Sequence, residues 1–213
     1  MVVAEERRAA EIGRDILRAG GNAIDAAVAV GYGLAVVDPC CGTLGGGGFM
    51  TIHLADGRET VIDFRETAPA AATARMYLGA DGEPVAEWSR HGWRAAAVPG
   101  SVGGLDRAAR EYGRLPRKTL IAPAAALARD GYVLSPADAE LLDAGAARFK
   151  HDPAAAKIFL RPDGSPLMAG DRLVQDDLAA VLAAIAEAGP GAFYDGPIAA
   201  MVDKGTRANG GIR

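Results

Sequence analysis

Cysteine is nearly absent from this 213-residue sequence, which holds only Cys40 and Cys41. Adjacent cysteines rarely form a disulfide, because the eight-membered ring strains the geometry that the bond favours. A zinc site needs several ligands from separate turns, which two neighbouring residues do not supply. The sequence therefore predicts neither a disulfide framework nor a zinc site.

Long apolar runs and strong net charge are absent as well. No uninterrupted apolar stretch reaches the length of a transmembrane helix, and the N-terminal segment lacks the apolar core of a secretory signal peptide. The net charge of −4 argues against a binding surface for nucleic acid or for anionic membranes. We expect neither nucleic acid nor a membrane as a partner.

Half of the residues are hydrophobic, which is enough for a sizeable core in a chain of this length. Residues 4–19 have the periodicity of an amphipathic helix. Asn22, with Asp25 three residues later, predicts the capped start of a second helix over residues 23–37. That helix is apolar almost all round and should be buried on several sides. Further helices are predicted for residues 101–112, 123–129, 136 onward, 175–188 and 198–207.

A glycine run followed by a β-hairpin separates the first two helices from the rest. Gly45–Gly48 lack Cβ atoms, so another stretch of backbone can approach them closely. Apolar and polar residues then alternate on both sides of Asp56-Gly57, a strong signal for a hairpin turn. On the return strand Phe64 faces one way, whereas Asp63 and Arg65 face the other.

These stretches together resemble the γ-glutamyltransferase (γ-glutamyltranspeptidase) family. Several separate motifs occur in the order and spacing of the front of that family's large subunit, which is more specific than any single glycine run. The motifs are Gly20-Gly-Asn-Ala-Ile-Asp-Ala-Ala-Val-Ala29, Gly45-Gly-Gly-Gly-Phe-Met50, Asp63-Phe-Arg-Glu-Thr-Ala-Pro69, Val98-Pro-Gly100, Tyr112-Gly-Arg-Leu-Pro116 and Gly191-Ala-Phe-Tyr-Asp-Gly196. The resemblance covers nearly the whole chain.

The resemblance implies an α+β fold, the four-layer αββα sandwich of the Ntn-hydrolases. Only one hairpin is predicted here, and a single hairpin is marginally stable by itself, so we expect the sandwich to be incomplete in this chain. Residues 1–213 would then be the N-terminal portion of a large subunit, a single domain that is truncated. Relatives are commonly exported, so a periplasmic or extracellular location follows if a signal precedes this sequence.

Members of the family cleave themselves and expose a threonine as the N-terminal nucleophile of a small subunit. That threonine lies downstream of everything present here, so the resemblance implies no catalytic residue in this chain, which alone should be inactive. The implied partners are the small subunit and a small-molecule substrate, glutathione or another γ-glutamyl compound. No metal and no organic cofactor is implied.

Arg65 is the candidate substrate-binding residue. A planar guanidinium binds a carboxylate through two hydrogen bonds, which fixes orientation as well as charge. By resemblance, the arginine of the Arg-Glu-Thr-Ala-Pro motif holds the α-carboxylate of the γ-glutamyl donor. The residues alone also allow an ion pair between Arg65 and Asp63, a common and weak kind of surface interaction.

Other candidate sites have simpler interpretations. Gly45–Gly48 is not a phosphate loop, because no Gly-Lys-Ser/Thr follows it. Ser101 lacks the glycine that a nucleophile elbow needs two residues earlier, and we expect it to cap a helix. His53, His91 and His151 are scattered along the sequence and are expected at the surface or hydrogen-bonded in the core.

The leading hypothesis is part of a γ-glutamyltransferase or glutathione hydrolase, which cleaves γ-glutamyl amides and passes the acyl group to water or an amine. Two alternatives keep the same architecture. An acylase of the cephalosporin-acylase type acts on another substrate, and a non-catalytic partner subunit has no chemistry of its own. A threonine motif encoded downstream would distinguish the enzymes from the partner subunit.

Overall fold

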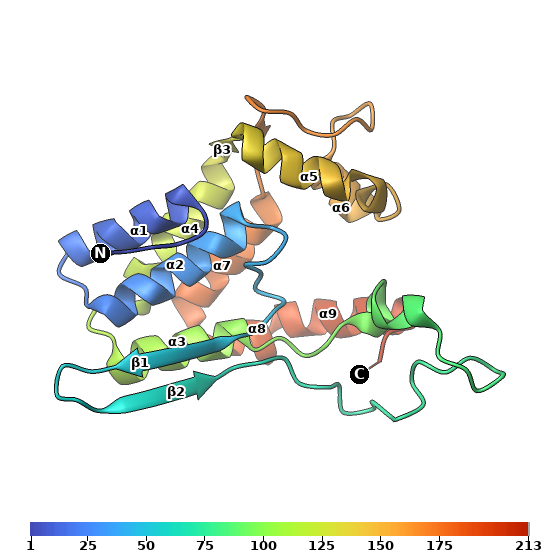
Figure 1. Cartoon of the computed structure of the whole chain (residues 1–213), viewed down its shortest axis with the longest axis horizontal. Helices are drawn as coiled ribbons and strands as arrows, with labels where there is room; N and C mark the ends of the chain where they lie inside the picture. The colour runs from blue at the N-terminus through green and yellow to red at the C-terminus, as the bar shows by residue number, and fades with distance from the viewer. Residues whose placement is uncertain (213) are drawn as a thin grey trace.

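The computed structural model describes residues 1–212 as packed helices with two small sheets (Figure 1). The elements are α1 (Arg7–Arg18), α2 (Ala23–Val37), β1 (Phe49–His53), β2 (Glu59–Asp63), α3 (Ser101–Tyr112), α4 (Arg117–Asp130), β3 (Tyr132–Val133), α5 (Pro136–Phe149), α6 (Pro153–Phe159), β4 (Arg172–Leu173), α7 (Asp176–Ala188), α8 (Gly191–Tyr194) and α9 (Pro197–Ala208). Two 3-10 turns, η1 (Ala86–Ser89) and η2 (Trp93–Ala95), lie in the long connection before α3.

The first two helices begin where side chains cap them. The carboxylate of Glu6 accepts hydrogen bonds from the first backbone N–H groups of α1, so this helix starts at Arg7, three residues later than the sequence predicts. The bounds predicted for α2 are confirmed. Asn22 and Asp25 form the expected capping box, in which each side chain accepts from the other residue's backbone N–H.

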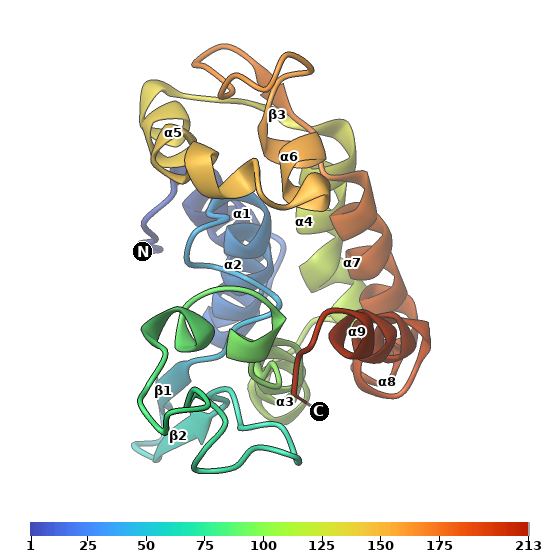
Figure 2. The same cartoon turned by 90° about the vertical axis from the view of Figure 1, so that its right-hand side faces the viewer.

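The apolar helix α2 lies at the centre of the core. It packs against α1, α3 and α4, and Val28, Val36 and Tyr32 on it are almost completely buried. This confirms the prediction of a helix covered on several sides. In Figures 1 and 2, α4 and α7 lie on one side of α2, and the hairpin lies below it with α3.

The hairpin has one buried and one exposed face. β1 and β2 pair antiparallel, with Met50 opposite Ile62 and Ile52 opposite Thr60. Ile52 and Ile62 are buried, whereas Val61 is largely exposed, as the alternation predicts. The buried face contacts α3, which lies between the hairpin and the α8–α9 pair in Figure 2.

The second sheet and the short helices α6 and α8 have no counterpart among the predicted elements. β3 and β4 pair over only two residues each, too short for any alternation to be visible. The predicted helix over residues 123–129 is wrong at its start, because α4 begins at Arg117 and contains Pro123. Leu120 and Ile121 ahead of the proline are fully buried, and their packing offsets the cost of a proline within the helix.

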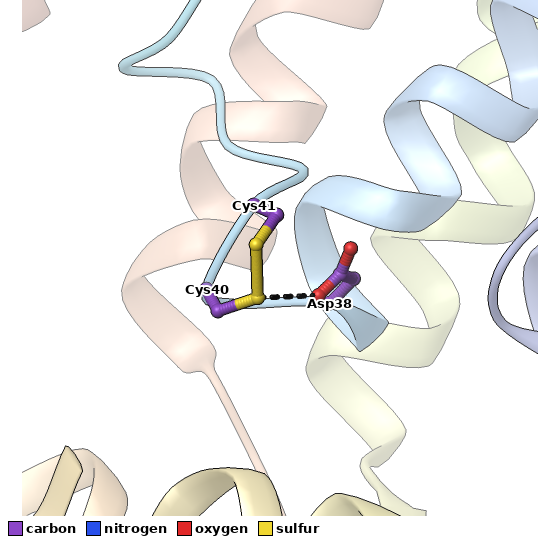
Figure 3. The surroundings of a disulfide bond; sticks show 3 residues. All are labelled: Asp38, Cys40 and Cys41. Atoms are coloured by element: carbon purple, nitrogen blue, oxygen red, sulfur yellow. Dashed lines mark hydrogen bonds between the residues drawn. A yellow bond between two sulfur atoms is a disulfide. The ribbon is translucent and has the colours of Figure 1, made fainter. Parts of the chain in front are cut away.

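The expectation that Cys40 and Cys41 do not bridge is wrong. A disulfide joins them in the exposed turn that follows α2 (Figure 3). The turn is held by the carbonyl of Asp38, which accepts hydrogen bonds from the backbone N–H of Cys41 (3.2 Å) and Gly42 (2.9 Å). This turn brings the two side chains to the same side of the backbone, so the bond forms between neighbours.

In the described part of the chain, no helix has the length and apolar character needed to cross a membrane.

Candidate functional site

Backbone hydrogen bonds on both sides fix the segment that carries Arg65. Gly48 and Phe64 exchange two backbone hydrogen bonds, of 3.3 and 2.9 Å. Thr67 and Val98 exchange two more, of 3.1 and 2.9 Å. Arg65 therefore sits on an immobilised stretch between the glycine run and the segment that leads into α3.

The glycine run admits a neighbouring backbone, as the sequence predicts. A Cβ atom placed on Gly47 would lie 2.8 Å from the backbone nitrogen of Glu66, too close for any side chain. The carbonyl of Gly46 accepts hydrogen bonds from the backbone N–H groups of Gly100 (2.9 Å) and Ser101 (3.0 Å). The run thus joins the Arg65 segment to the start of α3.

Two side chains hold the start of α3 against this loop. Ser101 does not cap the helix, contrary to expectation: Gly100 occupies the cap position, and the Ser101 hydroxyl donates to the carbonyl of Thr43 at 3.1 Å. The hydroxyl of Tyr194 accepts from the N–H of Gly103 and donates to the carbonyl of Pro99, both at 3.0 Å. Four of the family-like motifs therefore meet around one loop.

The side chain of Arg65 pairs with Glu66. Its Nε donates to Glu66 Oε2 at 3.2 Å, and its guanidinium carbon lies 5.9 Å from the centre of the Phe49 ring. The alternative pair with Asp63 does not form, because the Asp63 carboxylate accepts from the backbone N–H of Arg65 instead, at 3.0 Å. The sequence offered Glu66 as a neighbour of Arg65, but nothing in the pattern distinguished it from Asp63 as the partner.

The end of the Arg65 guanidinium faces solvent. Its side chain is 64% exposed, and within residues 1–212 no hydrogen bond engages its two terminal nitrogens. These nitrogens carry the N–H groups that bind a carboxylate end-on. The arrangement is one that can accept an anionic group from outside the described chain.

An apolar cavity of about 310 Å³ lies beyond the Thr67–Val98 bridge. Its walls come from η2, the segment before α3, and the α8–α9 region, with Trp93, Val98 and Phe193 among them. Arg65 does not line it. The cavity is therefore separate from the candidate carboxylate-binding group.

A second group of motif residues is structural. Asp25, completely buried, accepts hydrogen bonds from the backbone N–H groups of Asn22 (2.8 Å), Arg114 (3.0 Å) and Leu115 (3.2 Å). The side chain of Asn22 donates to the carbonyl of Tyr112 at 2.7 Å. The Gly20–Ala29 and Tyr112–Pro116 motifs thus serve to tie α2 to the turn after α3.

Among residues 1–212, the titratable groups elsewhere form no catalytic constellation. All three histidines are exposed, as predicted, and His53 and His91 lie beside Glu59 and Glu87. The polar atoms of Asp38, Cys40 and Cys41 lie within 4.8 Å of one another, a spacing that a metal ion could span. The two sulfurs are bonded to each other, however, and the ligand form of cysteine is the thiolate.

Comparison with known proteins settles the family. The family model for gamma-glutamyltranspeptidase matches residues 9–213. The chain belongs to the γ-glutamyltranspeptidase family. It is 48% identical over 212 residues to a glutathione hydrolase proenzyme of Pseudomonas sp. (strain A14), covering 100% of this chain and 37% of the relative. An acylase ACY 1 proenzyme of Pseudomonas sp. (strain SE83) is 41% identical over 218 residues, covering 100% of this chain and 39% of the relative.

The solved structures agree with the family. The Helicobacter pylori γ-glutamyltranspeptidase superposes with a TM-score of 0.97 at 42% identity, covering 100% of this chain and 61% of that chain. This confirms the α+β, Ntn-hydrolase fold class that the resemblance implied. The present chain spans a little over a third of the length of the curated relatives named above.

Proposed function

We propose that residues 1–213 are the N-terminal portion of the large subunit of a γ-glutamyltransferase or glutathione hydrolase, and that they form a single domain of it. The observation that carries the proposal is Arg65, held on an immobilised backbone with its terminal guanidinium nitrogens unengaged by the described residues. Family membership supports the reaction class, and the identified relatives include a glutathione hydrolase.

In this proposal Arg65 binds the α-carboxylate of the γ-glutamyl donor. Glu66 holds Nε, which leaves the other edge of the guanidinium for an incoming carboxylate in a two-bond, end-on geometry. Glu66 also offsets the positive charge, so the site without substrate does not hold an unpaired cation. Arg65 thereby sets the orientation of the donor, while the bond that breaks lies at the other end of the glutamyl group.

The chemistry would come from a partner. A small subunit that carries an N-terminal threonine would supply the nucleophile, with its own α-amine as the base and backbone N–H groups for the oxyanion. The name proenzyme, borne by the relatives, fits such processing. The donor would be glutathione or another γ-glutamyl amide, and the acceptor water or an amine.

Cleavage of three chromogenic amides by the full-length protein tests the proposed function. We expect γ-glutamyl-p-nitroanilide to be cleaved at least about tenfold more efficiently than glutaryl-p-nitroanilide, which lacks the α-ammonium, and butyryl-p-nitroanilide, which also lacks the carboxylate, to be poorest. Preference for the glutaryl compound would instead favour the acylase, which the ACY 1 relative keeps open. A protein that neither splits into two chains nor releases nitroaniline would be the non-catalytic partner.

A further inference from the structure

The bond between Cys40 and Cys41 lies where a small molecule can reach it. Both residues are exposed, in the turn between α2 and the glycine run (Figure 3). Their Cα atoms are 3.8 Å apart, the spacing of any two residues across one trans peptide bond. Disulfides usually join Cα atoms 4.4–6.8 Å apart, and exposed bonds outside this range are the labile ones. This disulfide is therefore suited to exchange.

Asp38 makes the two sulfurs unequal. Its carboxylate oxygen Oδ1 lies 3.1 Å from the sulfur of Cys40, and Figure 3 shows the carboxylate directed at that sulfur. The side chain of Asp38 is almost buried, and the Cys40 sulfur is the group within residues 1–212 that lies at hydrogen-bonding distance from its carboxylate. A sulfur in a disulfide has no proton to donate, whereas a thiol does. Opening the disulfide therefore adds a hydrogen bond from Cys40 to Asp38.

The same carboxylate favours one product at equilibrium. Thiol–disulfide exchange is reversible, and an adduct on Cys41 leaves Cys40 as a thiol that can donate to the Asp38 carboxylate, whereas an adduct on Cys40 cannot make this bond. The turn itself does not depend on the disulfide, because the Asp38 carbonyl binds the N–H groups of Cys41 and Gly42. The opened form can keep the backbone seen here.

We propose that Cys41 is a covalent modification site for small thiols. The thiolate of the incoming molecule attacks the sulfur of Cys41 and forms a new S–S bond, and the Cys40–Cys41 bond breaks. Cys40 leaves as a thiolate and takes up the proton that the incoming thiol released. One thiol is consumed and one is formed, so no further oxidant or reductant enters.

This site goes beyond the proposed function and does not depend on it. If that function holds, the two are connected by chemistry: glutathione carries a thiol, and so does the product left after its γ-glutamyl group is removed. Cys41 would then be modified by the compounds that the enzyme handles.

The test uses N-acetylcysteine, a thiol that is not a γ-glutamyl amide, on the full-length protein purified without reductant. After incubation at mildly alkaline pH and quenching with acid, mass spectrometry should find one N-acetylcysteine added. Peptide mapping should place it on Cys41 at least about fivefold more often than on Cys40. N-acetylserine, which lacks the thiol, should add nothing.

Two variants test whether the preference for Cys41 over Cys40 comes from the charge of Asp38 or only from the exposure of the disulfide. In Asp38→Asn the charge is lost at nearly constant shape, and the preference for Cys41 should fall to about twofold or less. Asp56→Asn removes an exposed carboxylate in the hairpin turn and should leave the preference unchanged.

The proposal is overturned by an absent adduct, by an adduct on Cys40 at equal or higher yield, or by alkylation of both cysteines before any thiol is added. The wild-type distribution alone decides it, should the variant fail to fold.

Discussion

The ring of Phe64 lies directly over Gly104, in the space where any side chain at that position of α3 would begin. Gly100, one turn earlier, faces the carbonyl of Phe64 in the same way. Phe64, the residue before Arg65, therefore packs directly against α3 at Gly100 and Gly104. A side chain at either glycine must push this segment away.

Gly104→Ala should therefore destabilise the protein and displace the Arg65 segment. Overpacking of this kind costs about 1–3 kcal/mol, measurable as a lower free energy of unfolding in urea. Gly191→Ala is the matched control, since a Cβ there meets nothing within 4 Å. It should leave stability unchanged or raise it slightly. Equal stability of the two variants would contradict the close seating of Phe64.

Arg65→Lys should weaken donor binding in the full-length enzyme. Lysine keeps the charge but not the two-bond fork, so the lost charged hydrogen bond should raise the donor KM by the equivalent of about 1.5–3 kcal/mol. Steady-state kinetics with γ-glutamyl-p-nitroanilide measures this change.

The control is Arg58→Lys, at the start of the return strand. Arg58 is 74% exposed and pairs with Asp56 at 2.9 Å, so it resembles Arg65 in exposure and pairing but not in position. Its donor KM should match the wild type. An unchanged KM in Arg65→Lys would remove this residue from the proposed site.

The sequence predicted the long helices and the hairpin because each carries a local signal. The capping box at Asn22 and the alternation around Asp56-Gly57 involve residues close together in the chain, and both are confirmed. The second sheet depends on contacts between residues about forty positions apart, which leave no local pattern. The cysteine bridge differs from the prediction because ring strain between neighbours can be read from the sequence, whereas the turn that brings the two sulfurs together cannot.

The candidate site was predictable only in part. The Arg-Glu-Thr-Ala-Pro motif predicted Arg65 as the binding residue. The missing Cβ atoms of Gly45–Gly48 predicted that another stretch of backbone lies close to them. The pairing of Arg65 with Glu66, by contrast, depends on side-chain direction at the end of a strand. The hydroxyl of Tyr194 reaches Pro99 across the fold, and no single-sequence pattern joins residues that far apart.

Asp25→Asn should be strongly destabilising. Both carboxylate oxygens of Asp25 accept from the backbone N–H of Arg114, and an asparagine would turn an NH₂ group toward one of its donors. Loss of these charge-assisted bonds in a fully buried place should cost about 2–3 kcal/mol. Asp143→Asn, which changes an exposed carboxylate on α5, should have no measurable effect on urea unfolding. Similar midpoints for the two variants would show that the Asp25 bonds contribute little.

Asp38→Asn should stabilise the protein at neutral pH, and the gain should disappear in acid. Burial raises the pKa of Asp38 above its usual value of 3.8, helped by the negative charges of Glu5 and Glu6. The folded protein therefore holds this proton more tightly than the unfolded chain, and ionised Asp38 costs stability. The cost is absent below the unfolded-state pKa, grows as pH rises from there toward the folded-state pKa, and is constant above it.

The melting temperature of Asp38→Asn minus that of the wild type should thus increase as pH rises from about 4 and become constant above the folded-state pKa of Asp38. Asp56→Asn provides the opposite sign. The backbone N–H and the guanidinium of Arg58 lower the pKa of Asp56, so its ionised form stabilises the fold above the usual pKa, and that contribution is lost as pH falls. Asp56→Asn should therefore be less stable than the wild type at neutral pH, and the two should converge in acid. Parallel pH curves for the two variants would show that burial does not raise the pKa of Asp38.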